Sequence, residues 1–481
     1  MPKFVFLWTD IFVLALVLAV FLYAWHAART PALRSAWGQV GRSASAMSAA
    51  VVLVLFTLVA VLDSVHYRPK LADKEVDNGP VYAPVLRSAL DDMMSWTKLT
   101  QPEATYSAPL AIRQFTKETQ IINGEPVRDY PRLKNAGTHL QDDALHREDV
   151  WMRVGAGVLA GMVLSVVLAA LLTFLLRRSA GSMRHAFLRW WRCDTHLPIR
   201  AMWATTAVIA VVGCALVALS VDYHVLGTDR TGNDVMKQAL KSVRTALVIG
   251  TLTTLAMLPP ALFFGISAGY FKGRVDDAIQ YLYTTLTSIP GVLLIAACVL
   301  MMQVYIDTHP EAFPTVTARA DLRLFLLCLI LGLTGWAGLC RLLRAEVLKL
   351  RELEYVQAAR AFGVSHWRIM RRHLLPNVMH IVLITMVLQF SGLVLYEAVL
   401  SYLGIGVDPS MASFGTMIDA SRTEMSRDPM IWWNLLAAFV FMLALVLAAN
   451  IFADAVQKAF DPRMRKFQPL RAKPLLAKER A

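Results

Sequence analysis

Nine apolar stretches of about 20 residues each dominate this sequence of 481 residues. An α-helix rises about 1.5 Å per residue, so each stretch is long enough to cross roughly 30 Å of membrane hydrocarbon. The stretches lie at 5–26, 46–65, 152–176, 201–221, 243–268, 278–302, 322–343, 380–402 and 432–456. The sequence therefore predicts an all-α membrane protein with about nine transmembrane helices.

Composition and charge agree with lipid as the main solvent. Charged residues make up only 17% of the chain, whereas soluble proteins carry about 25%, and the mean hydropathy is +0.49. The net charge of +13 comes from basic residues that cluster in short loops, notably after the first, third and seventh stretches. The positive-inside rule places these loops in the cytoplasm and accounts for the charge without nucleic-acid binding. By the same rule the basic tail 466–481 is cytoplasmic, and an odd number of spans then places the N-terminus outside.

A polar segment at 66–150 separates the second stretch from the third and is expected to lie outside the cytoplasm. It contains no cysteine and can hold a small domain or a loosely ordered cap. We therefore divide the chain into an N-terminal module of three spans at 1–182, which carries this insert, a six-helix core at 183–465 and the tail. Residues 183–200 mix arginines with tryptophans, as in a helix lying among lipid headgroups or in a basic loop with interfacial tryptophans.

The sequence carries no recognisable catalytic or metal-binding motif. It lacks the GxxxxGK[ST] loop of P-loop ATPases and the HExxH helix of zinc proteases. The five cysteines lack the spacing of metal and redox sites, and we interpret them as packing residues. A GxSxG pattern at 265–269 ends an apolar helix, so its glycines, like Gly157 and Gly161, are interpreted as helix-packing surfaces. We expect no catalytic residue, metal or cofactor on this chain.

Three residues within the apolar stretches are candidates for a translocation path. Pro259 and Pro290 interrupt the fifth and sixth stretches, which frees backbone carbonyls and bends helices, although a packing kink explains them equally well. Glu397 is ionisable inside a membrane stretch, where an unpaired charge is costly and such groups are functional candidates. A helix-packing hydrogen bond or contact with the headgroup layer is the alternative for Glu397.

The cytoplasmic stretch 344–377 has the pattern of two short helices around a glycine. Residues 354–362 have helical composition, Gly363 breaks the helix, Ser365 can cap a second helix and Pro376 closes the stretch. Such a pair suits a groove on a partner protein, and a helix lying on lipid headgroups is the alternative. The second helix presents a basic and aromatic surface that includes Trp367, Arg368 and Arg371.

Two segments of this stretch, YVQAARAFG at 355–363 and RIMRRHLLPN at 368–377, resemble the EAA loop of ABC importer permeases. In that family the loop forms the coupling helix, with two alanines, a later glycine and a Leu-Pro pair. The family's acidic residue is Gln357 here, which puts a salt bridge from this position to the ATPase in doubt. The matching residues are Ala358, Ala359, Gly363, Leu375 and Pro376.

Three further segments resemble the C-type permease subunit of oligopeptide and dipeptide importers. They are HVLGTDRTGNDV at 224–235, ISAGYFKGRVDD at 266–277 and LSYLGIGVDPSMASFGTMI at 400–418. The resemblance covers the core and leaves 1–182 outside it. It implies that 224–235 and 403–431 face outside, where a binding protein docks, with a turn that only shapes the rim as the alternative for the first. The candidate docking residues are Asp229, Arg230, Asn233 and Asp234.

The resemblance implies a transport subunit with a type I ABC importer permease core, not an enzyme. Such a permease pairs with a second permease as a heterodimer, docks on two P-loop ATPase subunits that hold ATP and Mg, and receives solute from a periplasmic binding protein. The implied location is the bacterial inner membrane, among its lipids, with the C-terminus cytoplasmic. The implied solutes are oligopeptides, dipeptides or related small molecules. A proton-coupled carrier or a membrane-anchored sensor or scaffold is the alternative. The residues expected to couple to the ATPases are Gln357, Ala358, Ala359, Gly363, Trp367, Arg368, Arg371 and Pro376.

Overall fold

Nine helices of the described part of the chain are long and apolar enough to cross a membrane, which confirms the predicted number. The structure, a computed structural model, describes residues 3–76, 79–83, 85–122, 125–140, 142–180, 182–191, 197–309, 311 and 315–460. Cys193 and the tail 466–481 lie outside the described residues, so what the sequence predicts for them stays a prediction.

The helices follow the apolar stretches closely. The first half contains α1 (Trp8–Arg29), α2 (Pro31–Arg42), α3 (Ala44–Asp63), α4 (Ala89–Met93), η1 (Lys98–Thr100), η2 (Asp143–Leu145), α5 (His146–Ala180), α6 (Met183–Trp191) and α7 (Ile199–Ser220). The second half contains α8 (Val235–Phe271), α9 (Gly273–Ser288), α10 (Gly291–Thr308), α11 (Val316–Gly335), α12 (Ala337–Leu350), α13 (Glu354–Ala361), α14 (His366–Ile369), η4 (Met370–Leu374), α15 (Leu375–Tyr402), α16 (Phe414–Glu424) and α17 (Trp433–Phe460).

The insert at 66–150 forms small antiparallel strand pairs around short helices. β3 (Lys70–Val76) pairs with β4 (Gly79–Tyr82), and β6 (Glu118–Ile122) pairs with β7 (Glu125–Asp129). β2 (His66–Arg68) pairs with β5 (Arg87–Ser88) and also with β1 (Lys3–Val5), so that Lys3 lies opposite Arg68. The start of the chain therefore lies on the same side of the helix bundle as the insert, in agreement with the predicted shared side.

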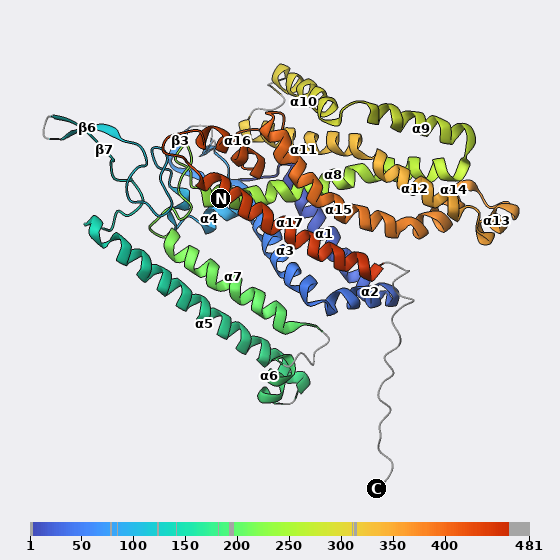
Figure 1. The fold of residues 1–481 in the computed structure, drawn as a ribbon, viewed down its shortest axis with the longest axis horizontal. Coiled ribbons are helices and arrows are strands. Elements are labelled where there is room, and N and C mark those ends of the chain that lie inside the picture. The colour runs from blue at the N-terminus through green and yellow to red at the C-terminus, as the bar shows by residue number, and fades with distance from the viewer. Residues whose placement is uncertain are drawn as a thin grey trace, which may run out of the picture.

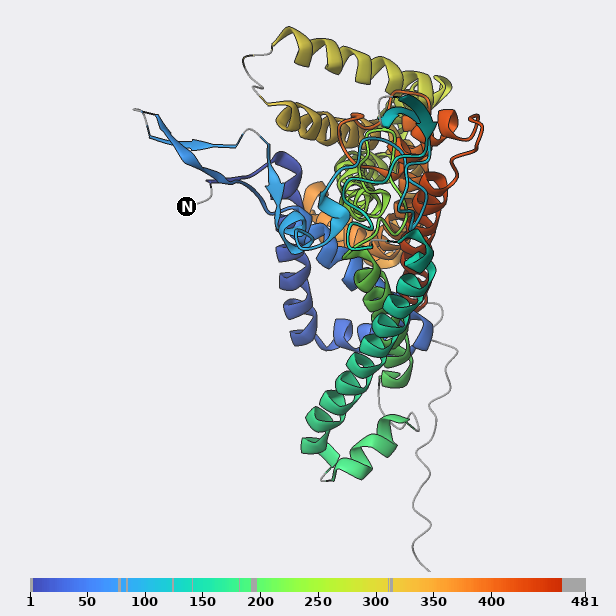
Figure 2. The same cartoon turned by 90° about the vertical axis from the view of Figure 1, so that its left-hand side faces the viewer.

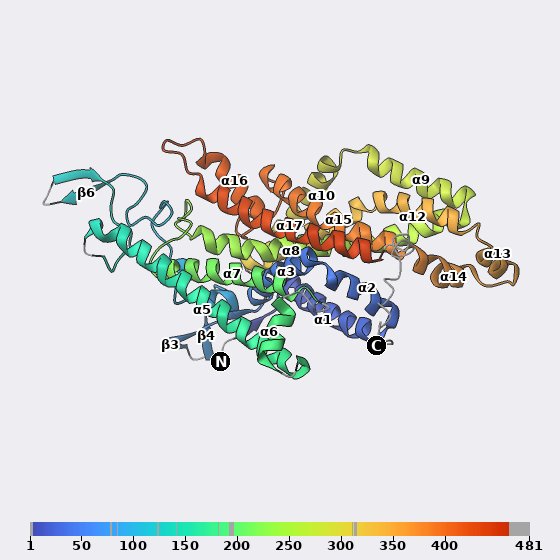
Figure 3. The same cartoon turned by 60° about the horizontal axis from the view of Figure 1, so that its bottom comes forward.

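The bundle has two distinct ends. In Figure 3 the β6–β7 hairpin and α16 lie at one end, whereas α13 and α14 lie at the other. α8 joins these ends, and its 37 residues correspond to a length of about 55 Å. Figure 1 shows α8, α12, α15 and α17 running along this axis in the core. The sequence segments expected outside and the loop expected in the cytoplasm are thus separated by the full height of the bundle.

The N-terminal helices pack directly on the core. α3 lies against α8, α17 and α7, and α1 lies against α11 and α8. α5 packs along α7, and Figure 2 shows this pair, with α6 at its end, diverging from the other helices. A β-carbon added at Gly161 would lie 2.5 Å from Val211 Cα, and one at Gly157 would lie 2.6 Å from Ala215 Cα. Both glycines therefore bring α5 and α7 into backbone contact, as the small-residue pattern predicts.

The glycines of the GxSxG pattern serve packing as well. A β-carbon at Gly265 would lie 2.8 Å from Leu343 Cβ, and one at Gly269 would lie 2.7 Å from Val347 Cβ. Both neighbours belong to α12, so the pattern marks the α8–α12 contact and not a strand-to-helix turn.

Two predictions about helix interruptions have opposite outcomes. The sixth stretch does break at Pro290, because α9 ends at Ser288 and α10 begins at Gly291. The fifth stretch does not break, since α8 continues through Pro259 and Pro260. The break predicted at Pro259 is therefore wrong, whereas the alternative of a packing kink stays open. α8 packs against α11, α12 and α15, and this packing supports the helix where the lost hydrogen bonds alone favour a break.

Candidate functional site

The element predicted to face the cytoplasm consists of two short helices joined at Gly363. α13 ends at Ala361, and Gly363 has a φ of +72°, in the left-handed region that residues with a β-carbon rarely adopt. The predicted end at Pro376 is wrong, because a π-helical turn leads from α14 directly into α15. Pro376 lies in the first turn of α15, where a missing N–H costs little. The second short helix is therefore the beginning of the eighth span.

Buried contacts hold this element, residues 354–377, against the core. Ile369 and Leu374 are fully buried in one hydrophobic cluster with Leu343 of α12. On the α8 side, Tyr270 Oη lies 2.8 Å from His366 Nδ1. A force on the 354–377 element is therefore transmitted to α8 and α12 through close packing.

The other side of the element is exposed and carries the predicted coupling residues. Phe362 is 87% exposed and Trp367 is 63% exposed, which is unusual for large aromatic side chains outside the lipid-facing surface. Arg368 and Arg371 are also exposed. The structure thus brings aromatic and cationic groups together on one free surface, as the pattern predicts.

The first helix of the element shows the role of Gln357, which stands where the ABC permease pattern has an acidic residue. Gln357 and Ala358 are exposed and Ala359 is partly buried. The Gln357 side-chain amide donates a 3.1 Å hydrogen bond to the Glu352 carbonyl, at the turn before α13. Gln357 therefore stabilises the start of α13. Because its side chain is neutral, it cannot form a salt bridge with a partner protein.

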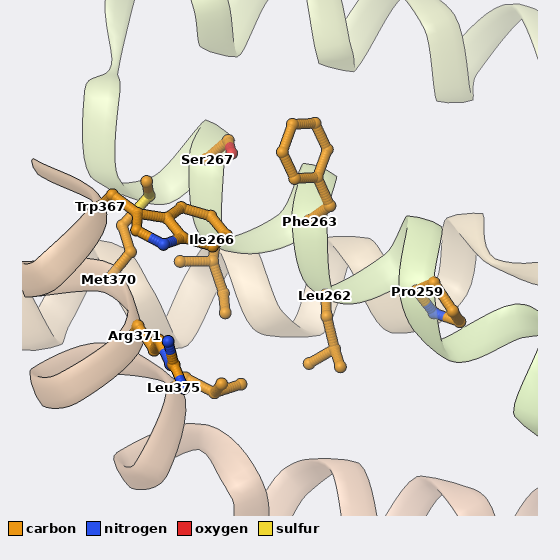
Figure 4. Close-up of a pocket in the computed structure, with 9 residues that line it drawn as sticks. All are labelled: Pro259, Leu262, Phe263, Ile266, Ser267, Trp367, Met370, Arg371 and Leu375. Atoms are coloured by element: carbon orange, nitrogen blue, oxygen red, sulfur yellow. The ribbon is translucent and has the colours of Figure 1, made fainter.

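An apolar cavity of about 300 Å³ lies between this element and α8. Figure 4 shows Trp367 and Met370 facing Ile266, with Leu262 and then Pro259 farther along α8. Pro259 therefore lies beside the 354–377 element. It is not among the residues that line the second, larger cavity.

A second cavity, of about 450 Å³, lies between α8, α9, α10, α11 and α15. Pro290 separates two residues of its lining, Ile289 and Gly291. Glu397 is not part of the lining: it is 1% exposed, and its Oε1 accepts hydrogen bonds of 2.7 Å from Ser401 and 3.0 Å from Ser413. This is the helix-packing role left open by the sequence. The polar lining residues are Thr253, Thr287, Thr334, Gln389 and Tyr396.

At the opposite end, the insert covers the turn that precedes α8. His224 Nδ1 lies 2.8 Å from the carboxylate of Asp234, which caps α8, and His224 Nε2 lies 3.5 Å from Glu103 of the insert. All three side chains are buried. Gly232 approaches the insert so closely that a β-carbon there would lie 1.9 Å from the Glu103 carbonyl oxygen. Asp234 is therefore enclosed, with no surface for a docking protein.

The remaining candidate docking residues form an open turn. Asp229 accepts hydrogen bonds of 2.8 Å from the backbone N–H groups of Thr231 and Asn233, which fixes the turn. Arg230 and Asn233 are exposed. The structure thus keeps two of the four candidates, Arg230 and Asn233, available at the surface.

Charges account for the tight attachment of the insert. Burial alone lowers the pKa of His224, but the carboxylates of Asp234 and Glu103 outweigh it and raise this pKa to about 9. Burial alone raises the pKa of Glu103, but the His224 imidazole at 3.5 Å and the backbone N–H donors at 134–136 outweigh it and lower that pKa. The His224 contribution to stability is complete below its ordinary pKa of 6.5 and is lost as the pH rises through about 9. The Glu103 contribution is present above its ordinary pKa of 4.5 and is lost as the pH falls.

Replacing Glu103 with alanine is expected to open the insert locally, at a cost of about 2–4 kcal/mol, because His224 and three backbone donors lose a buried charged acceptor. Limited proteolysis should show faster cleavage within 66–150, and the wild type should show the same change above about pH 9. The matched control is Glu118→Ala, on the exposed face of β6. Equal protection of both variants would contradict this account of the attachment.

The sequence did not identify a buried ion network that joins the N-terminal helix to the core. Arg244 of α8 donates to Asp10 of α1 and lies 3.5 Å from Asp321 of α11. Thr9 adds backbone donation to Asp321 at 3.1 Å. All four residues are at most 4% exposed. The sequence does place Arg244, Asp10 and Asp321 near the ends of three apolar stretches. It does not indicate that these three stretches pack against one another.

The described chain is a multi-span bundle with an exposed two-helix element at one end, a polar mouth formed by 224–235 and the insert at the other, and a cavity between them. This arrangement is typical of a membrane permease. Residues 261–466 match the family described as the binding-protein-dependent transport system inner membrane component. The chain is 30% identical over 244 residues to the dipeptide transport system permease protein DppC of Bacillus subtilis, which covers 50% of this chain and 70% of the relative. It is 31% identical over 245 residues to the oligopeptide transport system permease protein OppC of Mycobacterium tuberculosis, covering 51% and 78%. It is 34% identical over 241 residues to the peptidoglycan transport system permease protein YejE of Agrobacterium fabrum, covering 50% and 57%.

The chain belongs to this family of ABC transporter permeases. It is a multi-pass membrane subunit and not itself an enzyme, since ATP hydrolysis in such transporters is carried out by separate ATPases.

Proposed function

We propose that this chain is one of two permeases in an ATP-driven importer of dipeptides and oligopeptides in a bacterial inner membrane. The importer contains two P-loop ATPases, which hold ATP and Mg; one of them binds the 354–377 element of this chain and the other binds the second permease. The C-terminus is cytoplasmic. A solute-binding protein docks at the opposite end, around 224–235 and 403–431. The observation that carries the proposal is the exposed aromatic and cationic surface of 354–377, at the end opposite the mouth.

The packing suggests how ATP binding reaches the transport path. Closure of the ATPases displaces α13 and α14, and Ile369 and Leu374 transmit the displacement to α12. α8 and α15 also line the cavity of about 450 Å³ at membrane depth. Its threonine hydroxyls and the Gln389 amide can form hydrogen bonds with a peptide backbone, and its lining contains no charged side chain among the described residues. Binding in this cavity is therefore weak enough for a solute to leave again.

The insert at 66–150 is proposed as a fixed part of the outer docking surface. Its contacts with 224–234 are buried and ionic, which favours a permanent rim over a gate that swings away. The N-terminal module 1–182 is accordingly proposed to brace the core from the side of α3 and α1. The proton-coupled carrier is disfavoured because Glu397, an acid within a span, is committed to packing hydrogen bonds.

Uptake of labelled trialanine tests the solute class. The chain is reconstituted in liposomes with its second permease, ATPases and binding protein, and ATP is enclosed with the ATPases. We expect accumulation of trialanine that depends on both ATP and the binding protein. ATP hydrolysis stimulated by the binding protein without accumulation of any di-, tri- or tetrapeptide would contradict peptides as the solute.

A further inference from the structure

A polar cavity of about 450 Å³ lies at the outer end of the molecule, between the turn before α8 and the segment that carries α16. Asp229, Arg230 and Asn233 line it on one side, and Thr416 and Glu424 line it on the other. Its volume suits a ligand of a few residues, because small-molecule sites typically measure about 300–1,000 Å³. It is separate from both the coupling element and the cavity at membrane depth.

Glu424 is the unusual group in this cavity. Its side chain is 1% exposed, and within the described residues no lysine, arginine or histidine forms an ion pair with it; Arg427 acts on it only from beyond ion-pair distance. Asn434 Nδ2 donates to its Oε2 at 3.1 Å, and the Tyr106 hydroxyl also hydrogen-bonds to it. Burial raises the pKa of Glu424 above its ordinary value. A buried carboxylate without a cation in direct contact is costly, so a positively charged ligand stabilises it.

Asn434 supplies a second, independent indication of a ligand. It is 1% exposed and lines the same cavity, yet its Oδ1 has no hydrogen-bond partner among the described residues. Buried carbonyl oxygens are nearly always satisfied in native proteins. Because its amide nitrogen already donates to Glu424, the amide orientation is set and Oδ1 is left as a free acceptor.

The Glu424 carboxylate and the free amide oxygen of Asn434 lie side by side. Together they suit a ligand group that has several N–H donors and one positive charge. A primary ammonium group has three such donors. We propose that this cavity binds the primary ammonium group of an incoming peptide, with Glu424 as the charge partner and Asn434 Oδ1 as the second acceptor. Arg230, the exposed cation of the lining, is placed to attract the peptide carboxylate. The inference rests on the proposed peptide importer and names a first contact for solute released by the binding protein.

The same ammonium chemistry has two sources, the α-amino group of the peptide and a lysine of the binding protein. Calorimetry on the assembled transporter in lipid nanodiscs, without binding protein and with or without a non-hydrolysable ATP analogue, separates them. The probes are trialanine and N-acetyl-trialanine. We expect trialanine to bind at least 10-fold more tightly than its acetylated form, and Glu424→Gln to abolish that difference. The matched control is Asp419→Asn, an exposed acid on α16 outside the cavity lining, which should leave trialanine affinity unchanged.

Several outcomes overturn the inference. One is equal affinity of the two peptides for the wild type, and another is an unchanged preference in Glu424→Gln. If trialanine does not bind and Glu424→Gln instead weakens capture of the binding protein, the ammonium group belongs to that protein and not to the solute. A thermal melt of each complex excludes misfolding, and Asn434→Leu, which removes the amide without adding charge, provides a second variant. Trialanine uptake into liposomes without any effect of these variants rejects this site alone, whereas absence of all peptide uptake by the wild type rejects the proposed function.

Discussion

Replacing Arg244 with methionine should destabilise the protein by about 3–5 kcal/mol, because it removes the arginine that lies beside two buried acids, Asp10 and Asp321. Of the two acids, only Asp10 keeps another basic neighbour among the described residues, His66, whose Nδ1 lies 2.8 Å from its carboxylate. The Arg244 side chain reaches both acids from α8, and their own side chains are at most 1% exposed. The loss should separate α1 from the core before the rest of the bundle unfolds. Thermal melts in mild detergent, followed by proteolysis of the first helix, measure it.

Two further variants test whether electrostatics causes the loss of stability in Arg244→Met. Arg323→Met removes a less buried pair, since Arg323 is 22% exposed in its ion pair with Asp408, and should cost about 1 kcal/mol. The triple variant Arg244→Met, Asp10→Asn, Asp321→Asn removes the charges together and should regain most of the lost stability. Failure of the triple variant to recover would contradict the electrostatic explanation.

Replacing Gly363 with valine should reduce transport at least 10-fold while leaving the fold nearly intact. A β-branched residue at a φ of +72° is strained by about 1–3 kcal/mol, and no neighbouring atom within 4 Å of the added carbon opposes it sterically. The strain therefore changes the angle between α13 and α14 and not the packing. The measurement is peptide uptake together with the ATP hydrolysis that the binding protein stimulates.

Asparagine at position 363 provides the matched control, because it tolerates the left-handed region better than other residues with a β-carbon. Gly363→Asn should keep most of the uptake. If valine and asparagine impair transport equally, backbone conformation is not the cause and the glycine has another role. If neither impairs it, the 354–377 element does not transmit motion.

Local sequence properties were sufficient for the spans and for the coupling element. Apolar length predicted the nine spans, and the glycine with its flanking helical segments predicted α13 and α14. These features depend on residues close together in the chain. The break predicted at Pro259 did not form. Whether a helix breaks at a proline depends also on its neighbours, here α11, α12 and α15, and the local sequence does not specify these neighbours.

The candidate sites that depend on distant contacts could not be predicted. Asp234 looked like a surface acid in a polar turn, but Glu103, more than a hundred residues away, encloses it with His224. Glu424 and Asn434 gave no sequence signal, because an acid at the end of a short helix is ordinarily solvated. Only their shared burial in one cavity distinguishes them.

Site-specific photo-crosslinking from the 354–377 element tests directly whether this element binds an ATPase. A photoreactive phenylalanine analogue replaces Trp367, and in a second protein it replaces Trp432, which is 45% exposed at the outer end. We expect the probe at 367 to capture a P-loop ATPase in native membranes, identified by mass spectrometry, and the probe at 432 to capture none. Capture of lipid alone from position 367, together with a chain that purifies without any ATPase, would contradict a role of the 354–377 element in binding an ATPase.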